Sequence, residues 1–328
     1  MPPLDRALLS RLTAPGPRLP WLAGWLMEDV WSLDRYADLG PSEYLQQGEK
    51  EVNSFEELLA AAAWRIYNEL LTPPSSERDV SAFLDAHEAC AAVVFDGLSL
   101  REVPVVLRLA EESRLKVRTV GFSLAAVPGD TMEYVNQRLG VGRVAPSQLP
   151  SRRDLAERGV KAYYYGHQNQ QHRLEDNAEA LLLWSAFPDN TYADSGARFP
   201  QHFEQIHSLL ETAWLNTVQQ IPKGREILIT SDHGYVFFGA GLSFARGNEE
   251  LKPLRAYLRG ERFQRLGDGA PPPEHPDLAV LDDRGVAVIR GRVQTHPPGP
   301  AGSRLYKHGG LSLMEMLVPW ILLEAEDR

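Results

Sequence analysis

The chain has 328 residues, of which 43% are hydrophobic and 24% are charged, and it contains one cysteine. These values are typical of a globular protein with one large α/β domain or two smaller ones, and no apolar run approaches the roughly 20 residues that span a bilayer. The formal net charge of −10 excludes uniform wrapping of nucleic acid around the whole surface, although groups of arginine leave a local basic site open.

The N-terminus lacks the charged segment and the apolar run of a secretory signal. The single Cys90 cannot form a disulfide within the chain. Both observations favour the cytosol, so we expect a cytoplasmic protein that does not bind a membrane.

Residues 1–88 are predicted to be helical and carry no chemical motif. We therefore interpret them as a region for packing or for docking a partner. The Pro-Pro-Ser-Ser segment at 73–76 interrupts this region, and a short helix is predicted over 79–87.

The first clear strand is Ala91–Phe95, and Asp96 and a glycine follow it directly. A helix over 100–114 and a second strand over 116–122 come next. Together these elements predict a βαβ unit with a parallel crossover.

A Pro-Gly-Asp turn at 128–130 precedes Thr131, at which a helix is predicted to begin. Residues 146–154, with two prolines and several arginines, are predicted to form a loop. Further strands are predicted at 162–165 and 180–184, although the second is equally compatible with the end of a helix.

An acidic loop follows at 187–196 and contains Asp189 and Asp194. A long amphipathic helix over 201–220 then returns the chain to the sheet. These elements follow one another in the order strand, acidic loop, helix and strand. The first βαβ unit has the same order of elements.

The strand predicted at 226–230 is mainly apolar on both faces, which indicates a buried strand of a parallel sheet. Asp232 and His233 follow it, so an oxygen donor and a nitrogen donor lie at its carboxyl end. Ligands bind at this edge of open α/β sheets, and zinc or manganese accepts both donor types. We therefore predict that this pair binds a metal, the alternative being an Asp N-cap beside an ordinary His.

From about 240 to 303 the chain is richer in Gly, Pro and Arg, and we predict an insertion or cap over the site. It contains a β-hairpin over 278–289. The chain then returns with His308 and two glycines, a helix over 312–316 and a closing strand over 317–323.

Side chains with donor atoms occur at the predicted strand ends and turns: Asp96, Thr131, Asp189, Asp194, Asp232, His233 and His308. Carboxylates and imidazoles from different strand ends, with one hydroxyl at a turn, are the groups that two-metal ester hydrolysis requires. One ion activates the attacking oxygen, and the second stabilises charge on the phosphoryl oxygens. We predict two divalent ions, with zinc as the first choice and manganese or magnesium as alternatives.

Four segments occur in a familiar order: Val93–Ser99, Ala126–Thr131, Ile229–Tyr235, and His308–Leu313 followed by Met316–Pro319. Together they resemble the PglZ domain, a branch of the alkaline phosphatase superfamily that is associated with bacterial anti-phage BREX systems. No single segment is specific, but the four span about residues 91–323. The resemblance implies an alkaline-phosphatase-like α/β fold for residues 89–328, with a mostly parallel sheet flanked by helices and the cap at about 240–303.

The resemblance assigns Asp96, Asp232 and His233 to one metal ion, and it makes Thr131 the nucleophile that bridges toward this ion. The alternative for Thr131 is a helix N-cap, a position that threonine favours. Ser99 is the rival hydroxyl, although a helix-cap role suits it better. Because the nucleophile is Thr rather than Cys, sulfate-ester hydrolysis is disfavoured among the sister chemistries, which also include phosphoryl mutase activity.

The same resemblance assigns Asp189 and His308 to the second ion. In the wider superfamily a His commonly follows this Asp by three or four residues, whereas residues 190–193 contain none. Asp194 is therefore our candidate for the third ligand. The alternative is a weak or incomplete second site.

Two further residues are candidates for contacts with the substrate. Arg152 has the planar guanidinium that binds a phosphate through two hydrogen bonds. His167 lies in a polar loop that could line a substrate groove, although exposed loop histidines are common.

These residues predict hydrolysis of phosphomonoesters or phosphodiesters through a phospho-enzyme on Thr131, with a nucleotide or nucleic acid among the candidate substrates. The resemblance alone also leads us to expect a role in phage defence, with other defence proteins as partners. The competing hypothesis is a catalytically weak or inactive PglZ-type scaffold that docks such partners.

Overall fold

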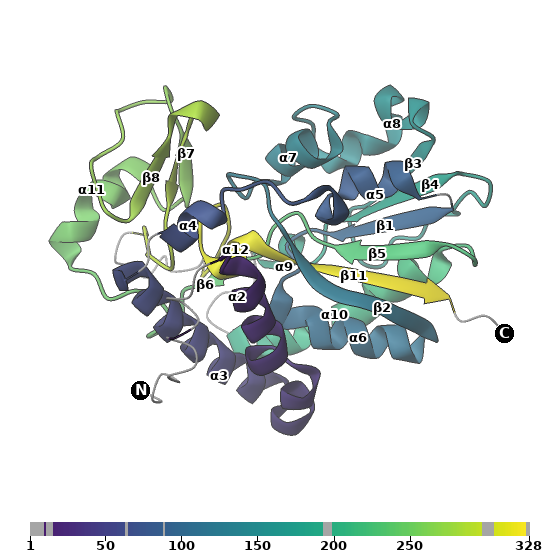
Figure 1. Cartoon of the computed structure of the whole chain (residues 1–328), viewed down its shortest axis with the longest axis horizontal. Coiled ribbons are helices and arrows are strands. Elements are labelled where there is room, and N and C mark those ends of the chain that lie inside the picture. Colours follow the sequence, from purple (N-terminus) through teal and green to yellow (C-terminus); the bar gives the residue numbers. More distant parts are fainter. Residues whose placement is uncertain are drawn as a thin grey trace.

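The computed structural model describes residue 10 and residues 16–62, 65–87, 89–192, 199–296 and 305–325. Its centre is a six-stranded sheet with the strand order β2-β11-β5-β1-β4-β3 (Figure 1). The strands of this sheet are β1 (Cys90–Phe95), β2 (Leu115–Leu124), β3 (Val160–Tyr165), β4 (Ala180–Ser185), β5 (Glu226–Thr230) and β11 (Leu317–Ala325).

Strands β3, β4, β1 and β5 pair in parallel, and β11 pairs antiparallel with both β5 and β2. Within this sheet β11 is thus the strand that runs against the others. The predicted fold class, a mostly parallel α/β sheet flanked by helices, is confirmed.

Every residue of β1 is buried, because the strand packs against apolar side chains on both faces of the sheet. Val93 and Phe95 belong to one apolar cluster, whereas Ala92, Val94 and the single Cys90 belong to the other. Figure 1 shows helices on both sides of the sheet. Helices α6 (Val103–Glu112) and α10 (Phe199–Asn216) contribute to the cluster of Val93 and Phe95. Helices α5 (Val80–Ala86), α7 (Thr131–Tyr134) and α8 (Arg153–Glu157) contribute to the cluster of Ala92 and Val94.

The described residues before β1 are largely helical, in agreement with the sequence pattern, and include α2 (Leu19–Trp25), α3 (Leu33–Ala62) and α4 (Arg65–Glu69). Helix α3 is interrupted at Gly40, which has a φ of 72° and precedes Pro41. Phe55 of α3 and Val103 of α6 belong to the same apolar cluster, so these helices share a core with the sheet. The domain boundary near residue 88 stays a prediction.

Much of the predicted insertion is a small separate layer, at the left of Figure 1. It contains helix α11 (Asn248–Leu258) and an antiparallel sheet in the order β7-β9-β8, with β7 (Phe263–Arg265), β8 (Leu278–Leu281) and β9 (Val286–Ile289). The predicted hairpin is thus present. A two-stranded ribbon of β6 (Val236–Phe237) and β10 (Tyr306–Lys307) joins the two ends of this layer to the main sheet.

Three local predictions differ from the structure, and one is the acidic loop predicted over 187–196, which contains helix α9 (Asp189–Tyr192). The loop predicted over 146–154 is wrong, since a 3-10 helix occupies 146–151 and α8 follows; Pro146 suits the first position of a helix. The helix predicted over 100–114 starts as a 3-10 turn and continues as α6. The remaining short elements are η1 (Leu26–Val30), η2 (Ser76–Arg78), η3 (Leu100–Glu102), η4 (Val135–Leu139), η5 (Pro146–Ser151), α9 (Asp189–Tyr192), η6 (Val218–Gln220), η7 (Asp282–Arg284) and α12 (Leu313–Met316).

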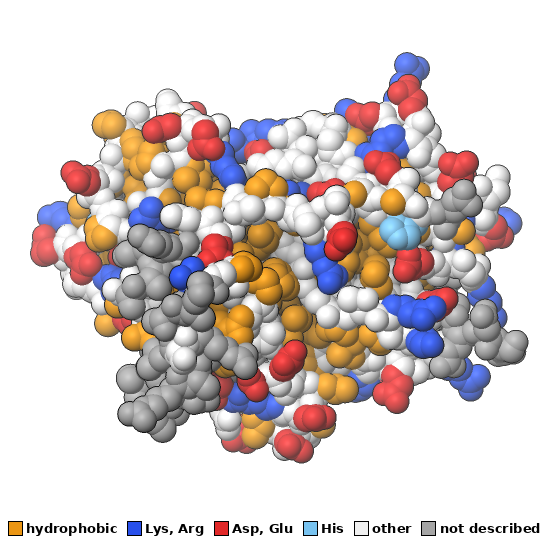
Figure 2. Space-filling view, in the orientation of Figure 1, with side chains coloured by type: hydrophobic (Ala, Val, Ile, Leu, Met, Phe, Trp, Pro, Cys, Tyr) orange, Lys and Arg blue, Asp and Glu red, His pale blue; other side chains and the backbone are white. Residues whose placement is uncertain are grey.

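Acidic and basic side chains are interspersed over the face shown in Figure 2, with apolar side chains between them. This face therefore lacks a continuous basic surface. The negative net charge predicts the same. Among the helices in the described part of the chain, none is both long enough and apolar enough to cross a membrane.

Candidate metal centre

Three neighbouring strands bring predicted ligands together at one edge of the sheet. Strand β1 lies between β4 and β5, and Asp96 follows β1, Asp189 follows β4, and Asp232 and His233 follow β5. The backbone N–H of Asp189 donates to the carbonyl oxygen of Asp96 at 2.9 Å, which ties two of these strand ends together. His308 joins them from the segment that follows β10.

Asp96, Asp232 and His233 form a buried group in which one donor atom of each residue lies within 4.8 Å of the others. The Nε2 atom of His233 is 3.5 Å from Asp96 Oδ1 and 3.5 Å from Asp232 Oδ2. The backbone N–H of Gly97 donates to Asp232 Oδ1 at 3.1 Å and orients this carboxylate. The donor atoms therefore converge on one small volume.

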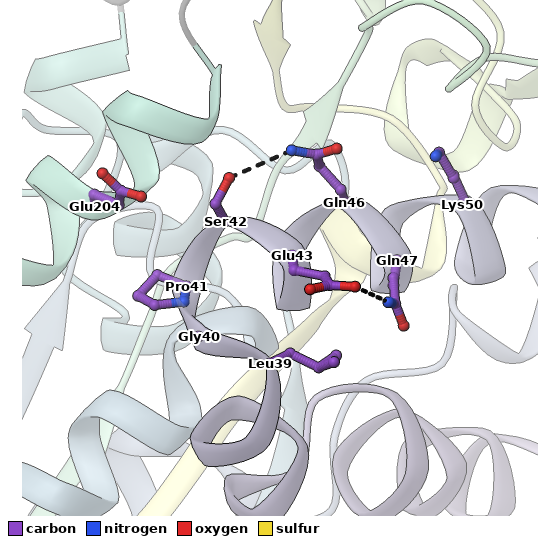
Figure 3. Close-up of a pocket in the computed structure, with 9 residues that line it drawn as sticks. All are labelled: Leu39, Gly40, Pro41, Ser42, Glu43, Gln46, Gln47, Lys50 and Glu204. Carbon is purple, nitrogen blue, oxygen red and sulfur yellow. Dashed lines mark hydrogen bonds between the residues drawn. The ribbon is translucent and has the colours of Figure 1, made fainter.

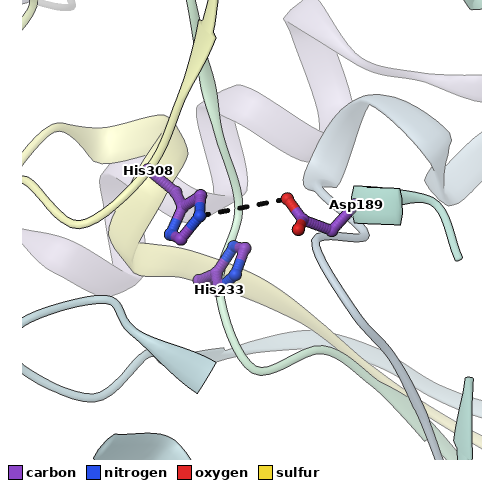
Figure 4. A group of neighbouring side chains, drawn as sticks. All are labelled: Asp189, His233 and His308. Carbon is purple, nitrogen blue, oxygen red and sulfur yellow. Dashed lines mark ion pairs between the residues drawn. The ribbon is translucent and has the colours of Figure 1, made fainter. Parts of the chain in front are cut away.

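Asp189, His233 and His308 form a second group with the same limit of 4.8 Å between donor atoms. Figure 4 shows that they come from three separate segments and that His308 points toward Asp189. The distance from His308 Nε2 to Asp189 Oδ1 is 3.9 Å. The rings of His233 and His308 stack with centroids 3.9 Å apart and planes at 3°. His233 thus lies between the two groups.

The backbone fixes the orientation of both histidines. Nδ1 of His308 hydrogen-bonds the Gly129 carbonyl oxygen at 2.8 Å, and Nδ1 of His233 hydrogen-bonds the Gly234 carbonyl oxygen at 3.1 Å. Each Nε2 therefore faces the carboxylates, and that of His233 is buried without a hydrogen-bond partner. A carbonyl behind each imidazole and a free nitrogen in front of it is the usual arrangement of metal-binding histidines.

Burial and like charge shape the protonation of this site. Burial raises the pKa of Asp96 well above its usual range, and the neighbouring Asp232 and Asp189 carboxylates raise it further. Burial also raises the pKa of Asp232, and it lowers the pKa of His233 to about 3, helped by the charge of His308. His233 is therefore held in the neutral form that binds metals, and a divalent cation would offset the crowded carboxylates. The donor set fits such an ion.

Thr131 is the first residue of α7, and its hydroxyl faces the carboxylates of the first group. Its Oγ1 atom is 2.8 Å from Asp232 Oδ2 and 3.5 Å from Asp96 Oδ1. The N-cap of α7 is Asp130, whose carboxylate accepts a hydrogen bond from the Glu133 N–H at 3.0 Å. The alternative in which Thr131 caps the helix is therefore wrong, and its hydroxyl belongs to the cluster.

Ser99, the rival hydroxyl, is fully buried and begins a helix. Its Oγ accepts a hydrogen bond from the Arg101 N–H at 3.2 Å and donates to Glu102 Oε2 at 2.6 Å. The Glu102 carboxylate also accepts from the Ser99 N–H at 2.8 Å, which completes a capping box. The cap role of Ser99 is confirmed.

The other predicted site residues are not joined to these groups by a contact in the described structure. Arg152 Nε donates to Asp154 Oδ1 at 3.0 Å. His167 is exposed, and its Nδ1 accepts from the Asn169 N–H at 3.3 Å. Asp194 lies outside the described residues. Contacts of Arg152 and His167 with a substrate, and of Asp194 with a metal, stay predictions.

Three residues that support the site were not predicted. Trp184 donates from Nε1 to Asp96 Oδ2 at 3.4 Å, and Ser231 Oγ donates to a carbonyl oxygen of β1 at 2.7 Å. Glu315 follows Ser312 by three residues, and this spacing is the sequence signal of a capping box, which is present. Neither Trp184 nor Ser231 carries a comparable signal, because each reads as part of a buried strand.

A separate cavity of about 550 Å³ lies on α3, where Gly40 interrupts the helix (Figure 3). Its polar side chains already pair along the helix: Gln46 Nε2 donates to Ser42 Oγ at 3.3 Å, and Gln47 Nε2 donates to Glu43 Oε1 at 2.7 Å. None of the predicted metal ligands lines it. This cavity is therefore separate from both groups of candidate ligands.

No protein-family profile matches the chain, and no curated protein matches it in sequence. Solved structures with a similar arrangement include murine ectonucleotide pyrophosphatase/phosphodiesterase 5, which is 15% identical with a TM-score of 0.44 over 72% of this chain and 88% of that chain. The human protein of the same name is 13% identical with a TM-score of 0.41 over 72% and 87%. Phosphonoacetate hydrolase from Sinorhizobium meliloti 1021 is 11% identical with a TM-score of 0.39 over 72% and 90%. These values are too low to carry an argument about function.

Proposed function

We propose that the chain is a metal-dependent hydrolase of phosphoric esters, of the alkaline phosphatase type, with Thr131 as its nucleophile. The observation that supports this proposal most directly is the hydroxyl of Thr131, 2.8 Å from Asp232 Oδ2 and 3.5 Å from Asp96 Oδ1. A hydroxyl held against buried carboxylates beside a neutral His is the arrangement expected of an activated oxygen nucleophile.

Asp96, Asp232 and His233 would hold one divalent ion, and Asp189 and His308 would hold the other. Asp194 is the proposed third ligand of the second ion. We favour zinc because imidazole and carboxylate donors occur together, with manganese and magnesium as alternatives. Bound ions would activate the attacking oxygen and stabilise charge on the phosphoryl oxygens.

The chain's own residues orient the reaction. Asp232 accepts the Thr131 hydrogen bond and is the group placed to hold the proton that leaves Oγ1. Oγ1 then bonds to phosphorus while the ester oxygen departs as an alcohol. Water attacks the threonyl phosphate in the second step, which releases the phosphate and restores the hydroxyl.

The direct test is to trap the phosphate on Thr131. Metal-loaded protein is mixed with an aryl phosphodiester, quenched in acid and digested, and mass spectrometry should find the phosphoryl group, which still carries its second ester, on the peptide that contains Thr131. Turnover without this modification would assign the nucleophile to another group.

The competing proposal is a PglZ-type scaffold with little or no activity. Its support is the second group, since no His occurs at 190–193 and the Asp189 and His308 side chains are 34% and 33% exposed. Metal analysis separates the two proposals: about two ions per chain support the hydrolase, and none after gentle purification supports the scaffold.

Phage defence, a nucleotide or nucleic acid substrate, and partner defence proteins enter this proposal from the resemblance in sequence. Copurification from a host that carries a complete defence system would test the partners. Comparison of mononucleotide esters with oligonucleotides as substrates would test the substrate class.

A further inference from the structure

Glu315 contacts both of the segments that carry the candidate histidine ligands. Its carbonyl oxygen accepts a hydrogen bond at 2.9 Å from the N–H of Gly234, the residue after His233. Its Oε1 atom accepts one at 2.8 Å from the N–H of Gly310, two residues after His308. Glu315 is fully buried. One residue thus ties together two loops that are far apart in the sequence.

Arg262 holds the side chain of Glu315 from the predicted cap at 240–303. Its Nε donates to Glu315 Oε1 at 2.9 Å, and its Nη2 donates to Oε2 at 2.6 Å. The same guanidinium donates to the carbonyl oxygens of Val293 at 2.8 Å and Gly291 at 2.6 Å. Arg262 is fully buried, so the pair fixes the cap and the His308 segment to each other.

The backbone leaves little freedom at these contacts. A Cβ atom at Gly234 would lie 2.1 Å from the Met314 carbonyl oxygen. Gly309 has a φ of 104°, and a Cβ atom there would lie 2.6 Å from Phe263 Cδ1 of β7. Both histidine-bearing segments therefore pack closely, one against the Glu315 segment and the other against the cap.

The capping box with Ser312 accounts for the Glu315 carboxylate but not for its ion pair with Arg262. Burying two charges costs desolvation energy that offsets their attraction, and an apolar pair of similar volume would pack as well. An apolar side chain at 315, however, could not accept the hydrogen bond from Gly310. The position of the His308 segment depends on that acceptor.

We propose that Glu315 and Arg262 are positioning residues that set the relation between His233 and His308 and thereby couple the cap to metal binding. The inference rests on the proposed function, because it takes the two histidines as metal ligands. Their stacked rings, with centroids 3.9 Å apart, are the geometry that the pair maintains. Cap displacement would then weaken metal binding, and metal binding would hold the cap in place.

The test compares zinc binding by metal-free wild type and by the double variant Glu315→Leu with Arg262→Met, which removes the acceptor for the Gly310 N–H. Removing both charges avoids an unpaired buried charge. We expect at least a tenfold weaker zinc affinity in chelator competition, and shifted His233 and His308 side-chain signals in NMR spectra of the metal-free protein. The NMR readout does not depend on activity or on bound metal.

The matched control is the double variant Arg35→Gln with Glu51→Gln. These residues form a similar bidentate ion pair within helix α3, with both distances 2.8 Å, and neither belongs to a group of described side chains that could hold a metal. No described contact joins them to either histidine segment. The control should bind zinc as wild type does.

Wild-type zinc affinity and unshifted histidine signals in a folded Glu315→Leu/Arg262→Met protein would overturn the inference and leave the proposed function standing. A wild type that binds no divalent ion would overturn the proposed function first, and the inference with it. If the double variant does not fold, hydrogen exchange in wild type decides. Zinc should then slow amide exchange at Gly310 and around Arg262, and unchanged exchange around Arg262 would overturn the coupling.

Discussion

The hydroxyl of Thr131 donates a 2.8 Å hydrogen bond to Asp232 Oδ2 and so joins the first turn of α7 to the end of β5. The two residues are 101 positions apart, and the contact exists only because the sheet brings its strand ends together. The hydrolase and scaffold hypotheses differ most clearly in what this hydroxyl does.

Thr131→Ala should retain bound metal while hydrolysis of an aryl phosphodiester falls by several orders of magnitude. Loss of Oγ1 removes the covalent path, whereas Asp96, Asp232 and His233 remain to bind the ion. Thr131→Ser should keep part of the activity, because it loses only the methyl group that positions the oxygen. The measurement is turnover per folded molecule at matched metal content.

Ser99→Ala is the control for the Thr131 variants. It removes a helix cap and should lower the free energy of unfolding by about 1 kcal/mol while turnover per folded molecule is kept. Equal turnover in wild type and Thr131→Ala would eliminate Thr131 as the nucleophile. Activity absent from all of these proteins would favour the scaffold.

Asp189→Ala should lower the occupancy of one ion and leave the other bound. Asp189 belongs only to the group with His233 and His308. The other group, Asp96, Asp232 and His233, is unchanged in this variant and should keep its ion. Elemental analysis after dialysis against limiting zinc gives the ions per chain. Loss of both ions in this variant would show that the two groups act as a single site.

Asp194→Ala should have the same effect as Asp189→Ala if Asp194 stands in for the missing His. The ions per chain are again the measurement. Wild-type occupancy in Asp194→Ala would make Asp194 an ordinary acid of the loop.

Asp96 and Asp232 should each contribute a loss of stability to the metal-free protein as the pH rises above about 4. Burial raises the folded-state pKa of Asp96 and Asp232 above the value of about 3.9 in an unfolded chain. Their contribution to the free energy of unfolding is therefore present at low pH and is lost as the pH rises through the folded pKa. Asp232→Asn should reduce this loss in urea unfolding with a chelator.

With saturating zinc at neutral pH, wild type should become more stable to unfolding than Asp232→Asn. Only wild type has the full ligand set, so it gains more stability from the bound ion. A difference between them that stays constant over the pH range, with chelator present, would contradict the role assigned to the Asp232 charge.

Glu56, which is not one of the candidate metal ligands, should also make stability depend on pH. Burial raises its pKa to about 7, although Oε1 accepts hydrogen bonds from the Leu313 N–H at 2.9 Å and the Tyr67 hydroxyl at 3.2 Å. Stability is therefore lost as the pH rises from about 4.3, the pKa of an unfolded Glu, through 7. Glu56→Gln should unfold like wild type near pH 4 and be more stable by about 3 kcal/mol near pH 8.

Glu111→Gln, on the exposed face of α6, is the control for Glu56. It should track wild type over the whole pH range in the same denaturation experiment. A Glu56→Gln protein that does the same would mean that Glu56 is charged at little cost in the folded state.

The strand-end ligands could be predicted because each strand is an apolar run that stops at a polar residue. Asp96 after β1 and Asp232 after β5 are of this kind, and parallel strands bring their carboxyl ends to one edge. The direction of β11 could not be predicted, because an apolar run of residues 317–323 looks the same in either orientation. Its pairing with β2 and β5 depends on contacts distant in sequence.

The supporting residues escaped prediction for a similar reason. The capping-box pattern marks Glu315 as the start of a helix but says nothing of Arg262, which is 53 positions away. We interpret the segment with β7 and α11 from its Gly, Pro and Arg content, although Leu251, Leu254 and Leu258 of α11 recur at helical spacing. Trp184 reads as a core residue, and only the fold shows that its indole N–H reaches Asp96.

Strand β1 places the only cysteine of the chain inside the sheet, where burial raises the pKa of the Cys90 thiol to about 11. Because the thiolate is the reactive form, Cys90 should resist maleimide at neutral pH until the protein unfolds. The Val280→Cys variant, at a β8 position that is 42% exposed, would then offer the single reactive thiol. A fluorophore or spin label can thus be attached to the layer of α11 and β7–β9 without removing the native cysteine, and any change in its position on addition of zinc can be measured in solution.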